Sequence, residues 1–232
     1  MGAFDQSAAV ALAQQFRGPA WLQPFREANQ AAWLASQWPD RKTEDWKYTT
    51  LAPLADSDYL RFGGADGADF DASQYQVDGL DCRRLVFVNG ELAPELCHRQ
   101  LAGGSSLVCF SEADERQQAL ITEHLGTLSS DSGNPFVALN GSWLEEGVLL
   151  HVAEDDPLPV HIVHLTRPGQ QPFSVRQRLL VVVEDNVSAT IVEHFASDDG
   201  RQNSFVNGVS ELKLGAAARL THYRLHLEQE NA

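Results

Sequence analysis

Hydrophobic side chains at helical spacing mark the first forty residues. In the first segment an apolar residue recurs every four positions, at Phe4, Ala8, Leu12 and Phe16. A second apolar stripe follows Gly18-Pro19 and comprises Trp21, Phe25, Ala28 and Ala32. Each stripe would form one face of a helix, and Asp5 or Ser7 suits the N-cap of the first helix. The pattern therefore predicts an N-terminal helical hairpin that closes at Trp38-Pro39.

The middle of the chain changes character. A polar stretch, RKTEDWKYTTLAPL at 41–54, leads into a Gly- and Asp-rich passage at 56–80 that is typical of a linker. RRLVFVNGEL then predicts a strand and a tight hairpin at Asn89-Gly90, because both residues tolerate positive φ. SLVCF at 106–110 predicts a further strand. The apolar stripe within SEADERQQALITEHLGTL predicts a helix, with Ser111 as its cap.

Short β runs take over after Asn134-Pro135, where the helical period disappears. They are GVLLHV, PVHIVHL, RLLVVVE, ATIVEHF, SFVNGVSEL and ARLTHYRLHL. The run LLVVV is apolar on both faces of a strand, so we expect both of its faces to be covered. Runs of this kind fit an all-β sandwich, a cupin-like barrel or the rungs of a solenoid, and no strict repeat decides among the three.

Charge and composition exclude several classes of protein. The chain has 232 residues, of which 43% are hydrophobic, enough for a globular core. Its formal net charge of −15 repels nucleic-acid phosphates, so we expect no nucleic-acid partner. No segment approaches the roughly 20 apolar residues of a membrane-spanning helix, and the N-terminus has no secretion signal. We therefore expect a cytoplasmic protein without a membrane partner.

Candidate catalytic and metal-binding groups are few. Cys82, Cys97 and Cys109 are widely spaced without a CxxC pair, so we interpret them as small buried hydrophobes. His161 and His164 lie three positions apart and would face opposite sides of a strand, and the HxH spacing of a cupin metal site is missing. No phosphate-binding loop, GxSxG or HExxH motif occurs.

One polar row remains as a candidate. His222, Arg224 and His226 share a strand face, and two imidazoles at this spacing can converge on a ligand. Arg224 would oppose a cation between them, and a polar row on one strand face is most often solvated. We therefore assign no catalytic or metal-binding residue, and we expect the isolated chain to bind neither iron nor a cluster.

The polar stretch at 41–54 carries a resemblance that the β runs alone do not. RKTEDWKYTTLAPL resembles the N-terminal signature of the SufB/SufD family of SUF-system iron–sulfur cluster assembly proteins, and of its SufD members in particular. RLVFVNGELAPEL, ATIVEHF and THYRLHLE are similar to later family segments, in the same order. The residues that match the family motif are Arg41, Lys42, Glu44, Trp46, Lys47, Tyr48 and Thr49.

The resemblance implies a fold and a division of the chain. It implies an α+β, β-dominated chain, in which an N-terminal helical hairpin is followed by the first rungs of a right-handed parallel β-helix. We expect a helical region at 1–55, a linker at 56–80, a small α/β segment at 81–135 and the start of the β-helix at 136–232. The chain matches about the N-terminal half of the family. Its end directly after a β run leads us to expect a truncated β-helix.

The resemblance also implies a function. Members of this family are non-catalytic scaffolds of the SufBCD complex, which assembles iron–sulfur clusters, and the chain's partners would be SufB and SufC, bound through regions mostly absent here. A free C-terminal rung leaves a homo-oligomer open. The alternative is a cupin-like or β-helix enzyme acting on a small molecule or polysaccharide. A general protein-interaction module is the third hypothesis.

The motif itself is expected to anchor the connection between the helices and the β region. Trp46 and Tyr48, together with Leu51 and Leu54, would pack on the domain surface while the charged side chains stay in water. We interpret this role as structural, and a docking site for a partner is the alternative.

Overall fold

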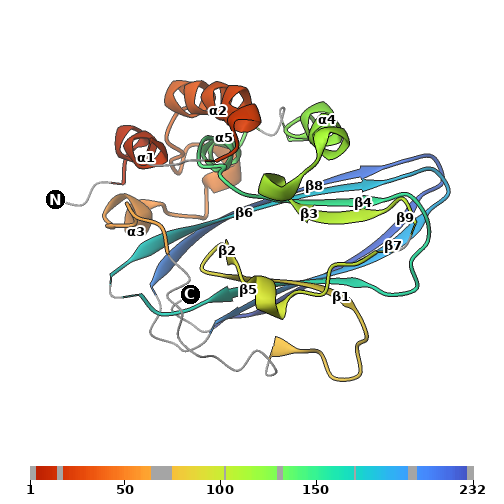
Figure 1. Cartoon of the computed structure of the whole chain (residues 1–232). Helices are drawn as coiled ribbons and strands as arrows, with labels where there is room; N and C mark the ends of the chain where they lie inside the picture. Colours follow the sequence, from red (N-terminus) through yellow and green to blue (C-terminus); the bar gives the residue numbers. More distant parts are fainter. Residues whose placement is uncertain are drawn as a thin grey trace.

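The strands of the chain form two sheets that face each other (Figure 1). The computed structural model describes residues 4–14, 18–63, 75–101, 103–129, 133–169, 171–197 and 203–228. One sheet has five strands in the order β2-β1-β5-β7-β9, and the other has four in the order β3-β4-β6-β8. The strands are β1 (Arg83–Val88), β2 (Glu91–Leu92), β3 (Ser106–Cys109), β4 (Val148–Val152), β5 (Val160–Thr166), β6 (Phe173–Val183), β7 (Ser188–Ser197), β8 (Ser204–Leu214) and β9 (Arg219–Leu227).

From β4 onward, successive strands alternate between the two sheets. As a result β4, β6 and β8 pair in parallel in one sheet, and β5, β7 and β9 pair in parallel in the other. Every β run expected after position 146 is therefore a strand. The parallel pairing rules out the antiparallel sandwich and the cupin-like barrel as descriptions of this region. The fold is a mixed α/β arrangement with two mostly parallel sheets.

Apolar side chains fill the space between the sheets. Leu150, Val181 and Ile162 are fully buried there, and they come from both sheets. The run LLVVV, expected to be covered on both faces, is buried throughout. Its outward-facing Leu180 and Val182 pack against a second cluster under the helices. Continuous burial thus explains why this run does not alternate with polar residues.

Two tight turns stack at one end of the sheets. Residues 184–187 join β6 to β7, and residues 215–218 join β8 to β9. The third residue of each turn has positive φ: 62° at Asn186 and 57° at Ala217. The amide of Asn186 donates to the carbonyl of Ala216 over 2.9 Å, and the Asp185 carboxylate accepts from the Ala216 amide at 2.6 Å. These hydrogen bonds therefore fix the position of the β8–β9 turn relative to the β6–β7 turn.

The hairpin predicted at Asn89-Gly90 is confirmed. β1 and β2 pair antiparallel, and the turn residues have φ values of 49° and 88°. A primed turn of this kind matches the twist of the two strands. It makes β2 the outermost strand of the five-stranded sheet beside β1.

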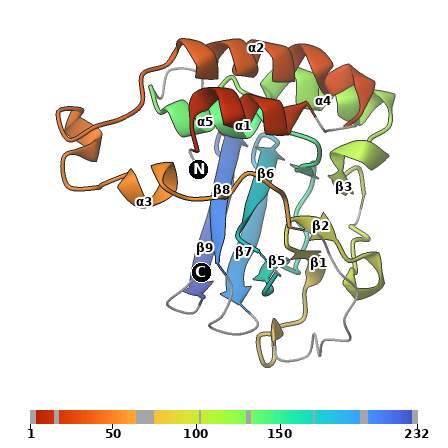
Figure 2. The same ribbon diagram turned by 90° about the vertical axis from the view of Figure 1, so that its left-hand side faces the viewer.

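A layer of helices covers the outer face of the four-stranded sheet (Figures 1 and 2). The helices are α1 (Gln6–Ala13), α2 (Gln23–Ala35), α3 (Ala52–Ala55), α4 (Glu115–His124) and α5 (Pro135–Ser142). An aromatic cluster lies beneath them, with Trp33 and Trp143 fully buried and Phe4 edge-on to Trp143 at 5.9 Å. None of the helices in the described ranges has the length and hydropathy needed to cross a bilayer.

The N-terminal helices form, but a hairpin is not confirmed. Asp5 caps α1 as expected, accepting from the Ala8 amide at 2.7 Å. α2 packs mainly along α5, a helix distant in sequence, and less against α1. The predicted stripe is correct for Trp21 and Phe25, which are partly buried against the core. It is wrong for Ala28 and Ala32, which are exposed, and Trp33 is the buried residue of α2. The indole of Trp33 donates to the carbonyl of Gln6, which fixes this orientation.

Two further local predictions were wrong. We expected β structure directly after Asn134-Pro135, but α5 forms there, with Asn134 as its N-cap. We expected Ser111 to cap the next helix, but Asp114 caps α4 in a reciprocal box with Gln117. Ser111 instead binds the carboxylate of Glu146 through its amide and hydroxyl.

A buried ion pair fastens the helical layer to the sheet. Arg178 of β6 and Glu211 of β8 form a salt bridge, and each side chain is only 1% exposed. Glu211 also accepts hydrogen bonds from the amides of Gly126 and Leu128, directly after α4. Arg178 donates to Asn140 of α5 at 3.1 Å. One pair of charges thus holds the ends of two helices.

Asparagines extend this connection along the same face. Asn140 donates to the carbonyls of Gln177 and Asn207, at 3.0 and 2.9 Å. Asn207 in turn donates to the carbonyl of Phe136 at 3.0 Å. α5 is therefore hydrogen-bonded to both β6 and β8, and its position depends on the register between these strands.

Removing Arg178 should destabilise the protein, and neutralising the Glu211 carboxylate that is then unpaired should restore part of the lost stability. Arg178→Met leaves the Glu211 carboxylate buried without its partner, which should lower the free energy of unfolding by on the order of 3–5 kcal/mol. The double variant Arg178→Met/Glu211→Gln keeps an oxygen acceptor for the Gly126 amide but carries no charge. Urea unfolding should find it more stable than Arg178→Met. Equal or lower stability of the double variant would contradict this account.

Candidate functional site

Four rings stack across the inner face of the five-stranded sheet. The parallel register sets one ring of each strand beside the next, from β1 through β5 and β7 to β9. The centroid distances are 5.6 Å for Phe87 and His164, 5.0 Å for His164 and Phe195, and 4.6 Å for Phe195 and His226. All three pairs are nearly parallel. This ring ladder ends on β9 with His226, whose side chain is 57% exposed.

A buried carboxylate lies beside the ring ladder. Glu193 of β7 is 2% exposed and shares the inner face with Ile191 and Phe195. The Nε2 atom of His222 is 2.7 Å from its Oε2 atom, and the Nε atom of Arg224 is 3.4 Å from it. The hydroxyl of Ser210, on the opposite sheet, donates to it over 3.4 Å. These four side chains form a polar cluster between the sheets, which we call the Glu193 cluster.

The electrostatics of the cluster favour an ionised Glu193. Burial alone raises the pKa of this carboxyl group. The nearby side chains of His164, Arg224 and His222 act against burial and hold the pKa of Glu193 below its ordinary value. The carboxylate is therefore a fixed negative charge that the basic groups around it stabilise.

His164 lies close to the Glu193 cluster but makes no hydrogen bond to it. Its Nε2 atom lies 3.7 Å from the Oε1 atom of Glu193, which is within ion-pair distance but too long for a direct hydrogen bond. Its ring is 8% exposed, and neither ring nitrogen has a hydrogen-bond partner among the described residues. The stacking on Phe87 and Phe195 positions this ring, rather than polar contacts.

The structure places the predicted polar row in an unexpected setting. His222, Arg224 and His226 share one face of β9, as the alternation predicted, but this face continues the inner face of β7. The His222 side chain is 16% exposed, so the row is not simply solvated. Sequence reasoning missed Glu193. The sequence did contain a signal for it. In the run ATIVEHF, every second residue points to the same face of the strand, and Glu193 is the one acidic residue among otherwise apolar side chains on that face.

The Glu193 cluster lacks the features of a metal-binding site among the described residues. The described residues contain no group of three or more His, Cys, Asp or Glu side chains arranged to hold a metal ion. Arg224 lies 3.4 Å from the Glu193 carboxylate, and its positive charge opposes the binding of a cation there. We therefore regard the Glu193 cluster as a device that fixes the register between β7 and β9.

A second pair of histidines lies on the outer face of the same sheet. His161 and His194 stack with centroids 5.6 Å apart, and they are 1% and 5% exposed. Burial, followed by the proximity of His194 and of Arg84, lowers the pKa of His161 to about 4. Burial also lowers the pKa of His194, although its contact with the Tyr75 backbone acts in the other direction. Both rings are therefore neutral at neutral pH.

This pair predicts a loss of stability in mild acid. The imidazole of His161 takes up a proton below about pH 6.5 when the chain is unfolded, but only near pH 4 when it is folded. The unfolded state thus binds more protons in this interval, and the free energy of unfolding should fall as the pH drops from 6.5 toward 4. Urea unfolding should show a shallower fall for His161→Phe.

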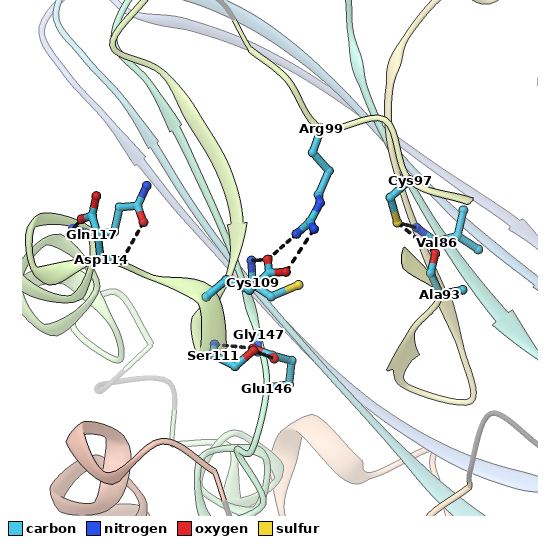
Figure 3. A network of polar contacts seen from close by, with 11 residues as sticks. Val86, Ala93, Cys97, Arg99, Cys109, Ser111, Asp114, Gln117, Glu146 and Gly147 are labelled. Atoms are coloured by element: carbon cyan, nitrogen blue, oxygen red, sulfur yellow. Dashed lines mark hydrogen bonds and ion pairs between the residues drawn. The ribbon is translucent and has the colours of Figure 1, made fainter. Parts of the chain in front are cut away.

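The cysteines lie in apolar or hydrogen-bonded surroundings (Figure 3). Cys109 is 1% exposed, and burial raises its thiol pKa, as do the nearby carboxylates. Cys97 accepts from the Val86 amide and donates to the Ala93 carbonyl, and burial raises its pKa too. Both thiols are therefore protonated and poor nucleophiles at neutral pH. Glu112 forms an ion pair with Arg99 and also accepts a hydrogen bond from the Cys109 amide.

The motif at 41–49 is anchored by one aromatic residue and exposes the other. Trp46 packs on Phe136 of α5, with ring centroids 5.4 Å apart. Leu51 and Leu54 join the same aromatic cluster. Tyr48, which we expected to pack as well, is 92% exposed. The anchoring prediction is thus correct for three of its four side chains and wrong for Tyr48.

A surface groove of about 740 Å³ lies between α2, the turn after α4, and α5. Its described lining is uncharged and largely made of small side chains, among them Ala28, Ala32 and Ala138. No charged side chain lines this groove among the described residues, so the groove gives no basis for assigning a reaction or a class of ligand.

Two family models match the chain. The model described as SufBD protein N-terminal region matches residues 6–162, and the SUF system FeS cluster assembly, SufBD core domain, matches residues 165–232. Together they cover nearly all of the chain in consecutive order.

Curated relatives agree with these matches. The chain is 29% identical over 196 residues to an iron–sulfur cluster assembly SufBD family protein of Synechocystis, covering 80% of this chain and 43% of the relative. It is 28% identical over 201 residues to the iron–sulfur cluster assembly protein SufD of Escherichia coli, covering 82% and 43%. It is 24% identical to a chloroplastic protein of Arabidopsis thaliana, ABCI7, covering 89% and 44%. The chain thus spans less than half the length of these relatives.

Proposed function

The chain belongs to the SufBD family, and from this membership we propose that it acts as a non-catalytic scaffold in SUF-system iron–sulfur cluster assembly. The observation that carries the proposal is the consecutive match of the N-terminal and core models over residues 6–162 and 165–232. Two of the relatives are named as iron–sulfur cluster assembly proteins. The chain would provide the N-terminal part of such a scaffold.

The partners proposed for this scaffold are SufB and SufC, within a SufBCD complex in the cytoplasm. They follow from the resemblance to SufD and from the SufD name of the Escherichia coli relative. The family's contact regions for these subunits lie mostly beyond the part that this chain matches. Any contact made by this chain would therefore use its own helices and first strands.

The two sheets are proposed to be the first turns of a right-handed parallel β-helix. The alternation of strands between the sheets supports this, because each turn of such a helix contributes one strand to each sheet. Crossovers between parallel strands are overwhelmingly right-handed. The division into 1–55, 56–80, 81–135 and 136–232 remains our proposed domain organisation.

Self-association through the last strands is a further proposal. β8 and β9 are the outer strands of their sheets in the described chain, on the same side of the molecule. Leu214, Tyr223 and Leu227 are exposed there, at 44%, 56% and 62%. A strand edge with apolar side chains is a template for pairing with another strand. A second copy is one such partner.

The absence of catalysis and of a bound cluster is supported by the site chemistry. The thiols of Cys97 and Cys109 have raised pKa values, so neither is a ready ligand for iron. The Glu193 carboxylate between the sheets is already paired with His222 and Arg224. An enzyme of the cupin type is not favoured, because the strands pair in parallel.

Reconstitution should leave the isolated chain colourless. After anaerobic incubation with ferrous iron and sulfide, followed by desalting, we expect no visible absorption band and no stoichiometric iron. The protonated thiols and the occupied Glu193 cluster are the reasons. A stable chromophore that is lost on Cys109→Ala would contradict this expectation and would turn the proposed scaffold into a cluster carrier.

Partner binding tests the proposed function directly. A tagged chain, co-expressed with SufB and SufC encoded in the same genome, should retain at least one of them through size-exclusion chromatography in 150 mM salt. A tagged, unrelated protein of similar negative charge should retain neither. If the chain elutes alone under these conditions, the scaffold proposal loses its support in this part of the protein.

A further inference from the structure

The β9 edge of the five-stranded sheet carries two rows of side chains that have neighbours on one side only. β9 is the last strand of this sheet in the described chain, and it pairs with β7. The ring ladder reaches β9 at His226, and Arg224 lies two residues before it on the same face. These two side chains are about half exposed, at 57% and 48%. Their partners on β7, Phe195 and Glu193, are buried, so both rows end at an accessible edge.

The outer face of the His226 ring is suited to another ring. The imidazole stacks on Phe195 with an interplanar angle of 7°, and its Nδ1 atom lies 3.6 Å from the Glu228 carboxylate. Because the stacked rings are parallel, the opposite face of the imidazole points away from β7, toward the position of a further strand. Phenylalanine and histidine already alternate along the ladder. An aromatic ring in the same register would continue it.

Arg224 places a positive charge beside the end of the ladder. Its Nε atom faces the Glu193 carboxylate over 3.4 Å, and its guanidinium carbon lies 4.8 Å from the centre of the Phe195 ring. Its two terminal nitrogens have no ion-pair partner among the described residues. A guanidinium group has five N–H donors, so it can pair with a second carboxylate. The row runs in register from Ile162 to Glu193 to Arg224, and a carboxylate is the complementary group for the next position.

We propose that Arg224 and His226 select the strand that pairs with the outer edge of β9. The selected strand runs parallel to β9. It places a carboxylate beside Arg224 and, two residues later, an aromatic ring beside His226. Opposite charges and aromatic pairs on neighbouring strands are each favourable, whereas like charges are unfavourable. The two positions therefore specify both the chemistry of the added strand and its register.

The occupant that fits this edge is a strand of a SufBD-family chain. β9 lies within the SufBD core match at 165–232, and the curated relatives are more than twice as long as the region matched here. A second copy that paired through its own β9 in this parallel register would set Arg224 against Arg224, so it is not the preferred occupant. The inference rests on the scaffold function proposed above, and it specifies how such a scaffold would recognise a neighbouring strand.

Fluorescence polarisation with labelled peptides tests this selection on the intact 232-residue chain. The probes match the nine residues of β9 and consist of Thr and Val except at the positions that lie beside Arg224 and His226. The peptide with Glu and Phe at these positions should bind about fivefold more tightly than the peptide with Lys and Phe. It should also bind about fivefold more tightly than the peptide with Glu and Ala. In about 1 M salt only the first difference should shrink.

Two variants of the chain give a matched comparison. His226→Ala should lose the preference for Phe and keep the preference for Glu, because Arg224 is still in place. Leu128→Ala removes an exposed apolar side chain that follows α4, and it should keep both preferences. Thermal unfolding of both variants should stay close to the wild type, since the two side chains are exposed.

The outcomes separate this inference from the scaffold function. Equal binding of the three peptides would show that Arg224 and His226 do not select a strand. Binding of none of them would also refute the proposal, and the two side chains would then protect the edge from pairing. Retention of SufB or SufC without any peptide preference would leave the scaffold function standing alone. A clear preference for Glu and Phe with neither subunit retained would support strand selection and remove the scaffold function.

Discussion

The buried salt bridge of Arg178 and Glu211 is the contact on which the arrangement of the layers depends. It joins β6 to β8 within one sheet, and it also holds the turn after α4 and one end of the α5 network. Two buried charges are costly to desolvate, so they are stable only when every neighbour is in place. The pair therefore couples the register of the sheet to the position of the helices. The aromatic cluster and the seat of Trp46 on Phe136 both depend on that position.

The strands could be predicted from the sequence because their signal is local. Runs such as LLVVV and the turn at Asn89-Gly90 specify extended structure by composition and by tolerance of positive φ. The pairing of every second strand could not be read in the same way, because it joins segments that lie far apart in the chain. The Glu193 cluster follows from this pairing. Residues 193 and 222 meet only because β7 and β9 are neighbours in a parallel sheet.

The errors in the helical region have a different origin. Local patterns identified that helices form near the N-terminus, but they did not identify which face is buried. Trp33 is the buried residue of α2 because its large ring fills the space beside α5, whereas Ala28 and Ala32 line the surface groove. Tyr48 was expected to pack with Trp46, because an aromatic side chain at the connection to the β region gains free energy by burial. In the structure the Trp46 indole packs on Phe136, and the Tyr48 ring is left in water.

The two stacked turns also constrain how homologous chains can change in length. Residues 184–187 and 215–218 are linked through the Asn186 amide and the Asp185 carboxylate, so a residue inserted in one turn would displace the other from its hydrogen bonds. Insertions and deletions during evolution should therefore be rare at these turns. They should accumulate instead in the segments that join β5 to β6 and β7 to β8, at the other end of the strands. An alignment of the family would then show a nearly constant spacing on one side of each strand and a variable spacing on the other.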